Sequence, residues 1–251
     1  MPIWDKYFSA EDKAIYDACG WGARGGLGTR PAVLIVDVNN AFVGDKDEPI
    51  ADSMKKWRSS CGPVAWRALP AIQALIRSAR DRRVPIVYTT GMEKRADGFD
   101  RGSWAYKNPR HKEDRLTVVP GMRGSDIVRQ IAPEQHDIVI LKPKASAFHG
   151  TPLIDYLNDL HVDSLIVCGT VTSGCVRATV VDASSYNYRV ALVEECTFDR
   201  FEVSHAINLF DMNAKYADVI SLVEATDYLA TVESGLYDDK IAFPLRESAT
   251  R

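Results

Sequence analysis

The chain has 251 residues, of which 46% are hydrophobic and 26% are charged, and its formal net charge at pH 7 is -3. This length and composition suit one large α/β domain, or two small ones, with a substantial buried core. The small net charge gives no electrostatic reason to expect nucleic acid or an anionic membrane as a partner, and no apolar run is long enough for a membrane span.

The number of cysteines and the N-terminal residues indicate the cellular compartment, and short motifs indicate which cofactors to expect. The five cysteines are an odd number without close pairing, and the first residues lack a signal-peptide pattern, so we expect a cytoplasmic protein without a disulfide framework. The chain has no CxxC or HExxH motif, and no GxGxxG motif follows its first predicted strand. We therefore expect neither a metal nor a dinucleotide cofactor.

Apolar runs that indicate strands alternate along the chain with helical patterns. Strands are predicted at residues 32–38, 84–89, 137–142, 164–167, 189–194 and 219–222, and helices at residues 64–82, 124–131, 151–160, 174–187 and 205–215. Such alternation predicts a three-layer α/β/α fold, with a Rossmann-like open parallel sheet of about six strands and helices on both faces. We expect one α/β domain at 31–232, an N-terminal extension at 1–30 and a C-terminal tail at 233–251.

Three regions fall outside the alternation. Residues 42–63 are polar and are expected to form an excursion after the first strand. Residues 91–123 contain Trp104 and Tyr106, and a loop this long and aromatic is typical of a lid or binding loop. The two ends of the chain also contain aromatic residues, which packing on a partner subunit would explain.

Residues 164–176 are the most informative stretch. They indicate a buried strand, a tight turn of small residues, and a helix whose first turn carries Cys175. A thiol there lies at the positive end of the helix dipole beside free N–H groups, which favour the thiolate and could hold an oxyanion. The alternative is that Cys175 simply packs the helix onto the sheet, as most free cysteines do.

Polar residues at the ends of other predicted strands favour the chemical interpretation. Ligands of open α/β sheets bind beyond the carboxyl ends of the strands, where the sequence places Asp37, Lys142 and the segment from Glu194 to Arg200. Taken singly, each could be a turn cap, a solvated strand end or a surface ion pair. Together with Cys175 they predict acyl transfer on a cysteine nucleophile. In that reaction the lysine favours the thiolate, and the carboxylate takes and returns the thiol proton.

Three motifs, in order, carry a resemblance to a known family. Residues 33–42 (VLIVDVNNAF) resemble its first strand and Asp motif, residues 142–153 (KPKASAFHGTPL) resemble K-x-x-x-S-A-F-x-x-T-x-L, and residues 168–176 (CGTVTSGCV) resemble G-x-x-T-x-x-C-V. The chain is thereby identified as a member of the isochorismatase-like superfamily of cysteine hydrolases, over roughly residues 31–230.

This resemblance implies roles for particular residues. Cys175 would be the nucleophile, Asp37 the proton acceptor, and Lys142 the cation that holds the thiolate and orients the substrate. A cis peptide is implied between Thr170 and Val171, with the N–H groups of Val171 and Cys175 forming an oxyanion hole. The resemblance also implies a homo-oligomer, a dimer or tetramer whose neighbours complete the site.

Within the superfamily, residues 172–179 with Asp199 and Arg200 downstream are most similar to N-carbamoylsarcosine and maleamate amidohydrolases. In that subgroup an arginine at the place of Arg200 grips the carboxylate of an acidic substrate, a role that suits the planar guanidinium fork. The alternative is an exposed Asp199/Arg200 ion pair. The other candidate substrate-binding residues are Thr172, Phe42, Trp104 and His149.

The sequence thus predicts a cysteine-dependent amidohydrolase that cleaves the C–N bond of a small carboxamide or N-carbamoyl substrate and releases ammonia through an acyl-enzyme. The segment Val38, Asn39, Asn40 departs from the usual [ML]-Q-[ND], and the metal-binding Asp and His residues of nicotinamidases are not found after Asp37. Two alternatives remain open: a vinyl-ether hydrolase of isochorismatase type, which needs no cysteine at this position, and a non-catalytic thiol-based sensor or binding protein.

Overall fold

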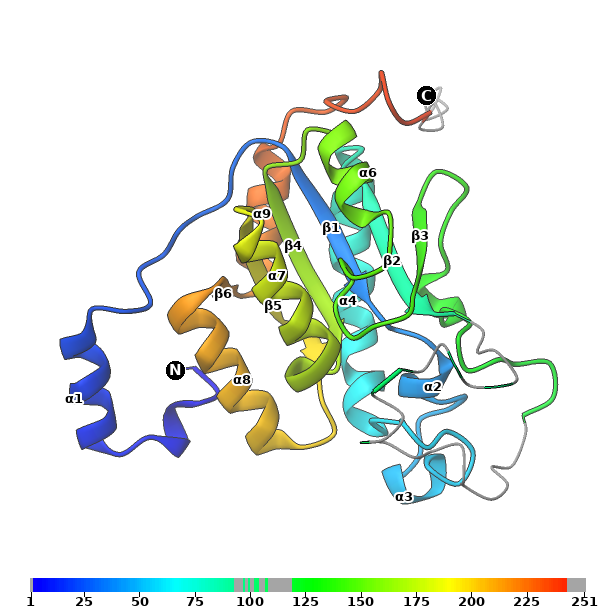
Figure 1. Cartoon of the computed structure of the whole chain (residues 1–251), viewed down its shortest axis with the longest axis horizontal. Coiled ribbons are helices and arrows are strands. Elements are labelled where there is room, and N and C mark those ends of the chain that lie inside the picture. Colours follow the sequence, from blue (N-terminus) through cyan, green and yellow to red (C-terminus); the bar gives the residue numbers. More distant parts are fainter. Residues whose placement is uncertain are drawn as a thin grey trace, which may run out of the picture.

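A six-stranded parallel sheet forms the centre of the molecule in a computed structural model, which describes residues 2–92, 97, 99, 102–103, 107 and 119–242 (Figure 1). Its order is β3-β2-β1-β4-β5-β6. The strands are β1 (Pro31–Val36), β2 (Ile86–Gly91), β3 (Ile138–Lys142), β4 (Ser164–Thr170), β5 (Arg189–Phe198) and β6 (Asp218–Ile220). The predicted fold class is confirmed. The chain reverses its direction of travel across the sheet between β1 and β4, which is where open α/β sheets bind ligands.

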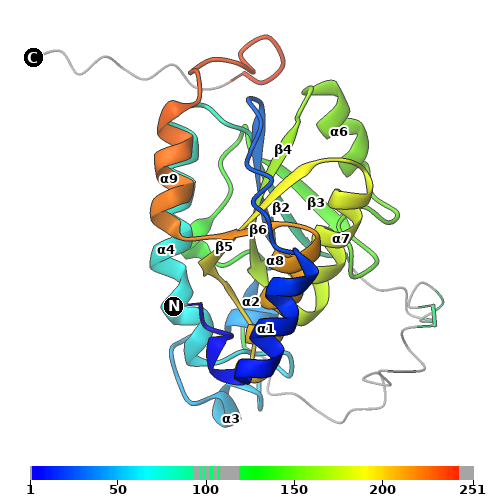
Figure 2. The same cartoon turned by 90° about the vertical axis from the view of Figure 1, so that its left-hand side faces the viewer.

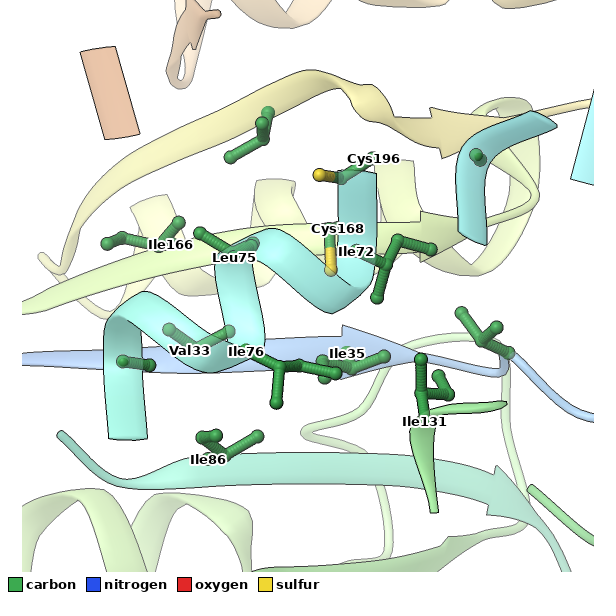
Figure 3. Packing of buried hydrophobic residues seen from close by; sticks show 14 of the residues in the cluster. Val33, Ile35, Ile72, Leu75, Ile76, Ile86, Ile131, Ile166, Cys168 and Cys196 are labelled. Carbon is green, nitrogen blue, oxygen red and sulfur yellow. The ribbon is translucent and has the colours of Figure 1, made fainter. Parts of the chain in front are cut away.

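Helices cover both faces of the sheet, as the view along its edge shows (Figure 2). On one face lie α4 (Pro63–Asp81) and α9 (Leu222–Thr231), and on the other lie α6 (Leu153–Asp159), α7 (Arg177–Ser185) and α8 (Glu202–Lys215). Every residue of β1 is buried because alternate side chains enter the two layers of core. Ile72, Leu75 and Ile76 of α4 pack over Val33 and Ile35 of β1 (Figure 3).

A glycine lets the two central strands approach closely at the edge where they end. Gly169 pairs with Val36 and has a φ of 109°, a conformation that side chains rarely adopt. A Cβ atom on Gly169 would lie 2.1 Å from the carbonyl oxygen of Val36. This close approach brings the residues after β1 and after β4 side by side.

One predicted helix, at residues 124–131, is wrong. Only a short 3-10 turn at Arg129–Ile131 forms there. The residues before it pair instead with the segment after β1: Asn40 N–H donates to the Asp126 carbonyl at 3.0 Å, and Asn39 pairs with Ile127 in an antiparallel bridge. Long-range pairing has therefore overridden the local helical pattern.

The excursion at residues 42–63 holds two single-turn helices, α2 (Asn40–Val43) and α3 (Ile50–Ser53). Two further helices, α1 (Ala10–Cys19) and α9, were not predicted. Both begin with a capping box, Ser9 with Asp12 and Ser221 with Glu224, which is a signal that the sequence contains.

Aromatic residues near the N-terminus pack on their own chain. The rings of Trp4, Phe8 and Tyr16 surround Phe210 of α8, with centroid distances of 6.3, 4.4 and 5.1 Å. The C-terminal segment behaves likewise, because the buried Tyr237 donates its hydroxyl to the Pro31 carbonyl at 2.8 Å. These contacts explain much of the aromatic content without a partner subunit, so the homo-oligomer stays a prediction.

Most of the predicted binding loop at residues 91–123, including Trp104 and Tyr106, lies outside the described residues. Within the part of the chain that the structure describes, no helix combines the length and the apolar character needed to cross a membrane. Over the same residues, no group of three or more His, Cys, Asp or Glu side chains is placed to hold a metal ion.

Candidate active site

Three predicted residues come together at the carboxyl edge of the sheet. Asp37 follows β1, Lys142 ends β3, and Cys175 lies in the turn after β4. Lys142 Nζ lies 2.7 Å from Asp37 Oδ2 and 3.3 Å from Cys175 Sγ. It also donates to the Lys144 carbonyl oxygen at 3.1 Å, so all three ammonium protons have a partner.

The backbone after β1 aims the Asp37 carboxylate into the site. Asp37 has a φ of 54°, in the left-handed region that aspartate tolerates better than most residues. Its N–H donates to the Thr89 carbonyl of β2, and the Thr89 hydroxyl donates to Asp37 Oδ1, both at 3.1 Å. Thr89 thus orients the carboxylate from the neighbouring strand. The sequence did not point to Thr89, because it is one apolar-flanked strand residue without a motif.

Burial and neighbouring charges act together on Lys142. Only 3% of Asp37 and 6% of Lys142 is exposed. Burial is the largest influence on the pKa of Lys142 and lowers it, but the charges of Asp37 and Cys175 and the hydrogen bonds to them together outweigh burial, so the net shift is upward and the ammonium is kept.

The predicted resting thiolate is not supported. Burial and the neighbouring Asp37 carboxylate raise the pKa of Cys175 to about 12, although Lys142 acts in the opposite direction. At neutral pH the site therefore holds a thiol, a carboxylate and an ammonium. A nucleophilic Cys175 must lose its proton during the reaction, and Asp37 is the base beside it.

The turn that carries Cys175 has an unusual backbone. The peptide bond between Thr170 and Val171 is cis. The next five residues, Thr172–Val176, form a π-helical turn that leads into α7, so Cys175 precedes the α-helix instead of lying in its first turn. The N–H groups of Gly174 and Val176 both donate to the Val171 carbonyl, at 2.9 and 3.3 Å.

The other candidate residues have varied surroundings. Thr172 is buried, and its hydroxyl lies 2.7 Å from Nδ1 of His205, so it is engaged within the protein. His149 is at the surface, with 63% of its side chain exposed, and its Nε2 lies 3.1 Å from Asp182 of α7. Trp104 lies outside the described residues.

Phe42 and Arg200 are both bonded to residues 59–61, which reach the end of β4. The carbonyl of Phe42 accepts the N–H of Cys61 at 2.8 Å, and the buried Cys61 sulfur lies 3.7 Å from the Thr170 hydroxyl. The half-buried Arg200 donates from its guanidinium to the Ser59 carbonyl at 2.6 Å. The predicted exposed Asp199/Arg200 ion pair does not form in this way, because Asp199 accepts the backbone N–H of Arg200 and its side chain is buried.

A buried carboxylate and a buried ammonium beside a half-buried thiol, at the switch point of a doubly wound sheet, define a hydrolase-type site without a histidine. A family model, the isochorismatase domain, matches residues 31–224, and the chain belongs to this family of hydrolases. The match covers most of the expected domain at 31–232.

Two curated relatives are amidohydrolases by name. Maleamate amidohydrolase of Pseudomonas putida is 32% identical over 209 residues, which are 83% of this chain and 91% of that protein. N-carbamoylsarcosine amidase of Arthrobacter is 34% identical over 220 residues, which are 86% of this chain and 77% of that protein. Among solved structures, a cysteine hydrolase of Pseudomonas syringae shares the fold, with a TM-score of 0.67 and 24% identity over 80% of this chain and 93% of that one.

Proposed function

We propose that this protein is a cysteine-dependent amidohydrolase that cleaves the C–N bond of a small carboxamide or N-carbamoyl substrate and releases ammonia. The contact of Lys142 with both Asp37 and Cys175 carries the proposal, because it places a nucleophile, a base and a fixed cation within one hydrogen-bonded group. The names of the two relatives support the same class of reaction.

In the first half-reaction, Cys175 Sγ attacks the carbonyl carbon while its proton moves to Asp37. The S–C bond forms, and the carbonyl electron pair moves onto oxygen. The family resemblance implies that the N–H groups of Val171 and Cys175 hold this oxyanion. Those of Gly174 and Val176 are bonded to the Val171 carbonyl. The C–N bond then breaks, and the proton on Asp37 passes to the leaving nitrogen, which departs as ammonia.

In the second half-reaction, water hydrolyses the thioester. Asp37 takes a proton from the water as its oxygen attacks the acyl carbon. The C–S bond breaks, the acid leaves, and the proton returns to the Cys175 sulfur. Lys142 keeps its proton throughout and stabilises the thiolate whenever it forms, which fits the upward shift of its pKa.

A protonated thiol favours this reaction over a thiol-based sensor. Sensor cysteines have a low pKa, whereas burial raises the pKa of Cys175 to about 12. A vinyl-ether hydrolase of isochorismatase type would leave the thiol without a role.

The test is ammonia release from maleamate, N-carbamoyl amino acids and simple amides. Cys175→Ser should abolish turnover, and intact mass measurement should detect an acyl adduct on the wild-type chain only. Cys19→Ser, at an exposed thiol at the end of α1, is the matched control and should keep full activity. Near-normal ammonia release by Cys175→Ser would overturn the proposal.

We further propose that the substrate carries a carboxylate held by Arg200. Its guanidinium has five N–H donors, so the bond to the Ser59 carbonyl leaves room for a bidentate contact. Arg200→Ala should lower kcat/KM for maleamate by a factor that corresponds to about 2–5 kcal/mol if the contact is desolvated. A neutral amide of similar size should lose far less, and equal losses would show that Arg200 only anchors the Ser59 loop.

A further inference from the structure

A buried carboxylate outside the three reacting groups grips the turn that carries the nucleophile. Asp199, which is 5% exposed, follows directly after β5. Its Oδ2 accepts two bonds from one residue of the turn, from the N–H of Ser173 at 3.0 Å and from the Ser173 hydroxyl at 2.6 Å. Its Oδ1 accepts the N–H of Arg200 at 2.7 Å.

A second side chain holds the adjacent residue of the same turn. Nδ1 of His205, in the first turns of α8, lies 2.7 Å from the hydroxyl of Thr172. Two consecutive residues of the turn, Thr172 and Ser173, are therefore bonded to the start of α8 and to the residue just after β5. Neither Asp199 nor His205 takes part in the proposed proton transfers.

A helical turn such as this one gains from an acceptor outside it. The first N–H groups of a helical segment have no partner within it, and a carboxylate near them is favoured by their positive potential. Ser173 is at such a position, two residues before Cys175. A rotation of the turn would move both the sulfur, 3.3 Å from Lys142, and the Cys175 N–H that the resemblance assigns to the oxyanion.

We infer that Asp199 is a positioning residue for the reaction: it locks the nucleophile turn to the end of β5 and keeps Cys175 aligned with Lys142 and Asp37. The inference rests on the proposed function for its effect on turnover, but the position of the thiol can be measured without it.

Asp199→Asn tests the inference. The amide of asparagine has the size of the carboxylate, but one of its two polar atoms is an NH₂ donor. That donor would face the N–H group of Ser173 or Arg200, so one hydrogen bond would be lost. We expect kcat to fall about 10- to 100-fold with little change in KM, since misplacement of a reacting group by about 1 Å costs that much. Ser173→Ala keeps the backbone bond and should lose less, and the double variant should be no worse than Asp199→Asn alone.

Alkylation of Cys175 by iodoacetamide across pH supplies a readout that a purely structural role would not move. A sulfur displaced from Lys142 and Asp37 meets a different balance of charges, so the inflection should move away from its wild-type pH in Asp199→Asn and, less far, in Ser173→Ala. If Asp199→Asn does not fold, the Ser173→Ala profile decides the matter.

The chain offers a matched control at the opposite edge of the sheet. Asp163, just before β4, accepts the Ser164 hydroxyl at 2.6 Å and the N–H groups of Thr29 and Arg30 at 2.8 and 3.0 Å. Asp163→Asn should reduce stability yet keep kcat and the alkylation profile. If Asp199→Asn behaves like Asp163→Asn in both measurements, the inference is wrong, whereas turnover by Cys175→Ser would instead refute the proposed function.

Discussion

Replacing Lys142 by methionine isolates the ion pair beside the nucleophile. The methionine fills much of the same space but leaves the Asp37 carboxylate buried without its counter-charge. Removing one partner of a buried pair costs about 3–5 kcal/mol of unfolding free energy. We expect Lys142→Met to lose this amount and to be inactive, because an unpaired buried carboxylate is relieved by taking up a proton and is then no base.

The distance between the two charges explains why a variant that keeps only one of them should be less stable than a variant that lacks both. At 2.7 Å and an effective dielectric constant of about 20, Lys142 and Asp37 attract each other by about 6 kcal/mol. Removing each ion from water costs several kcal/mol, so the complete pair stabilises the fold only slightly. A double variant, Lys142→Met with Asp37→Asn, buries no charge and should regain most of the lost stability. Asparagine tolerates the φ of 54° and can still accept the Thr89 hydroxyl.

Denaturant unfolding at pH 7 and ammonia release together check this prediction. The double variant should be nearly as stable as the wild type and yet inactive, because an amide cannot carry the thiol proton and general base catalysis contributes about 10²–10⁴-fold. Wild-type stability of Lys142→Met alone would refute the reasoning, since it would mean that the Asp37 carboxylate is not desolvated as its burial indicates.

Three further outcomes are expected. Iodoacetamide alkylation of Cys175 should inflect above the ordinary thiol value of about 8.5, and Asp37→Asn should lower that inflection because it removes a like charge; an inflection below 8.5 would contradict the burial argument. Burial lowers the pKa of His205, which the charges of Asp199 and Glu202 only partly oppose, so the unfolded chain binds this proton more readily. Stability should therefore be full above pH 6.5 and fall as the pH is lowered, and His205→Gln should flatten that slope in denaturant melts between about pH 5 and pH 7; an unchanged slope would assign it to other groups. Gly169→Ala should cost about 2–6 kcal/mol in the same melts, because its Cβ meets the Val36 backbone and its φ is strained; a wild-type midpoint would show that β1 and β4 can separate.

Much of the site could be predicted because it obeys a rule of topology. Asp37, Lys142 and Cys175 each follow an apolar run that indicates a buried strand, and the carboxyl ends of parallel strands meet at one edge. The order of the strands does not follow from hydropathy. It is the observed order that lets Lys142, on the outer strand β3, reach past β2 to Asp37 after β1.

The protonation of the thiol could not be predicted in the same way. A lysine and a helix N-terminus are visible in the sequence, and both favour the thiolate. Burial and the nearness of the Asp37 carboxylate depend on the tertiary structure. They raise the pKa of Cys175 by more than the local effects lower it. The helix predicted at residues 124–131 failed for a similar reason, because its backbone pairs with a segment about 85 residues earlier in the chain.

The charge balance of the site bears on where an acidic substrate can bind. With the thiol protonated, Asp37 and Lys142 cancel, and each ammonium proton of Lys142 already has a partner in Asp37, Cys175 or the Lys144 carbonyl. A substrate carboxylate therefore adds a negative charge that this group cannot neutralise without releasing the base or the sulfur. A second cation must supply the balance, and Arg200, beside the loop that contacts Thr170, can do so while the reacting groups keep their contacts. In the proposed function, binding and chemistry are divided between two cations, so loss of Arg200 should weaken the binding of acidic substrates selectively, while loss of Lys142 should abolish turnover of every substrate.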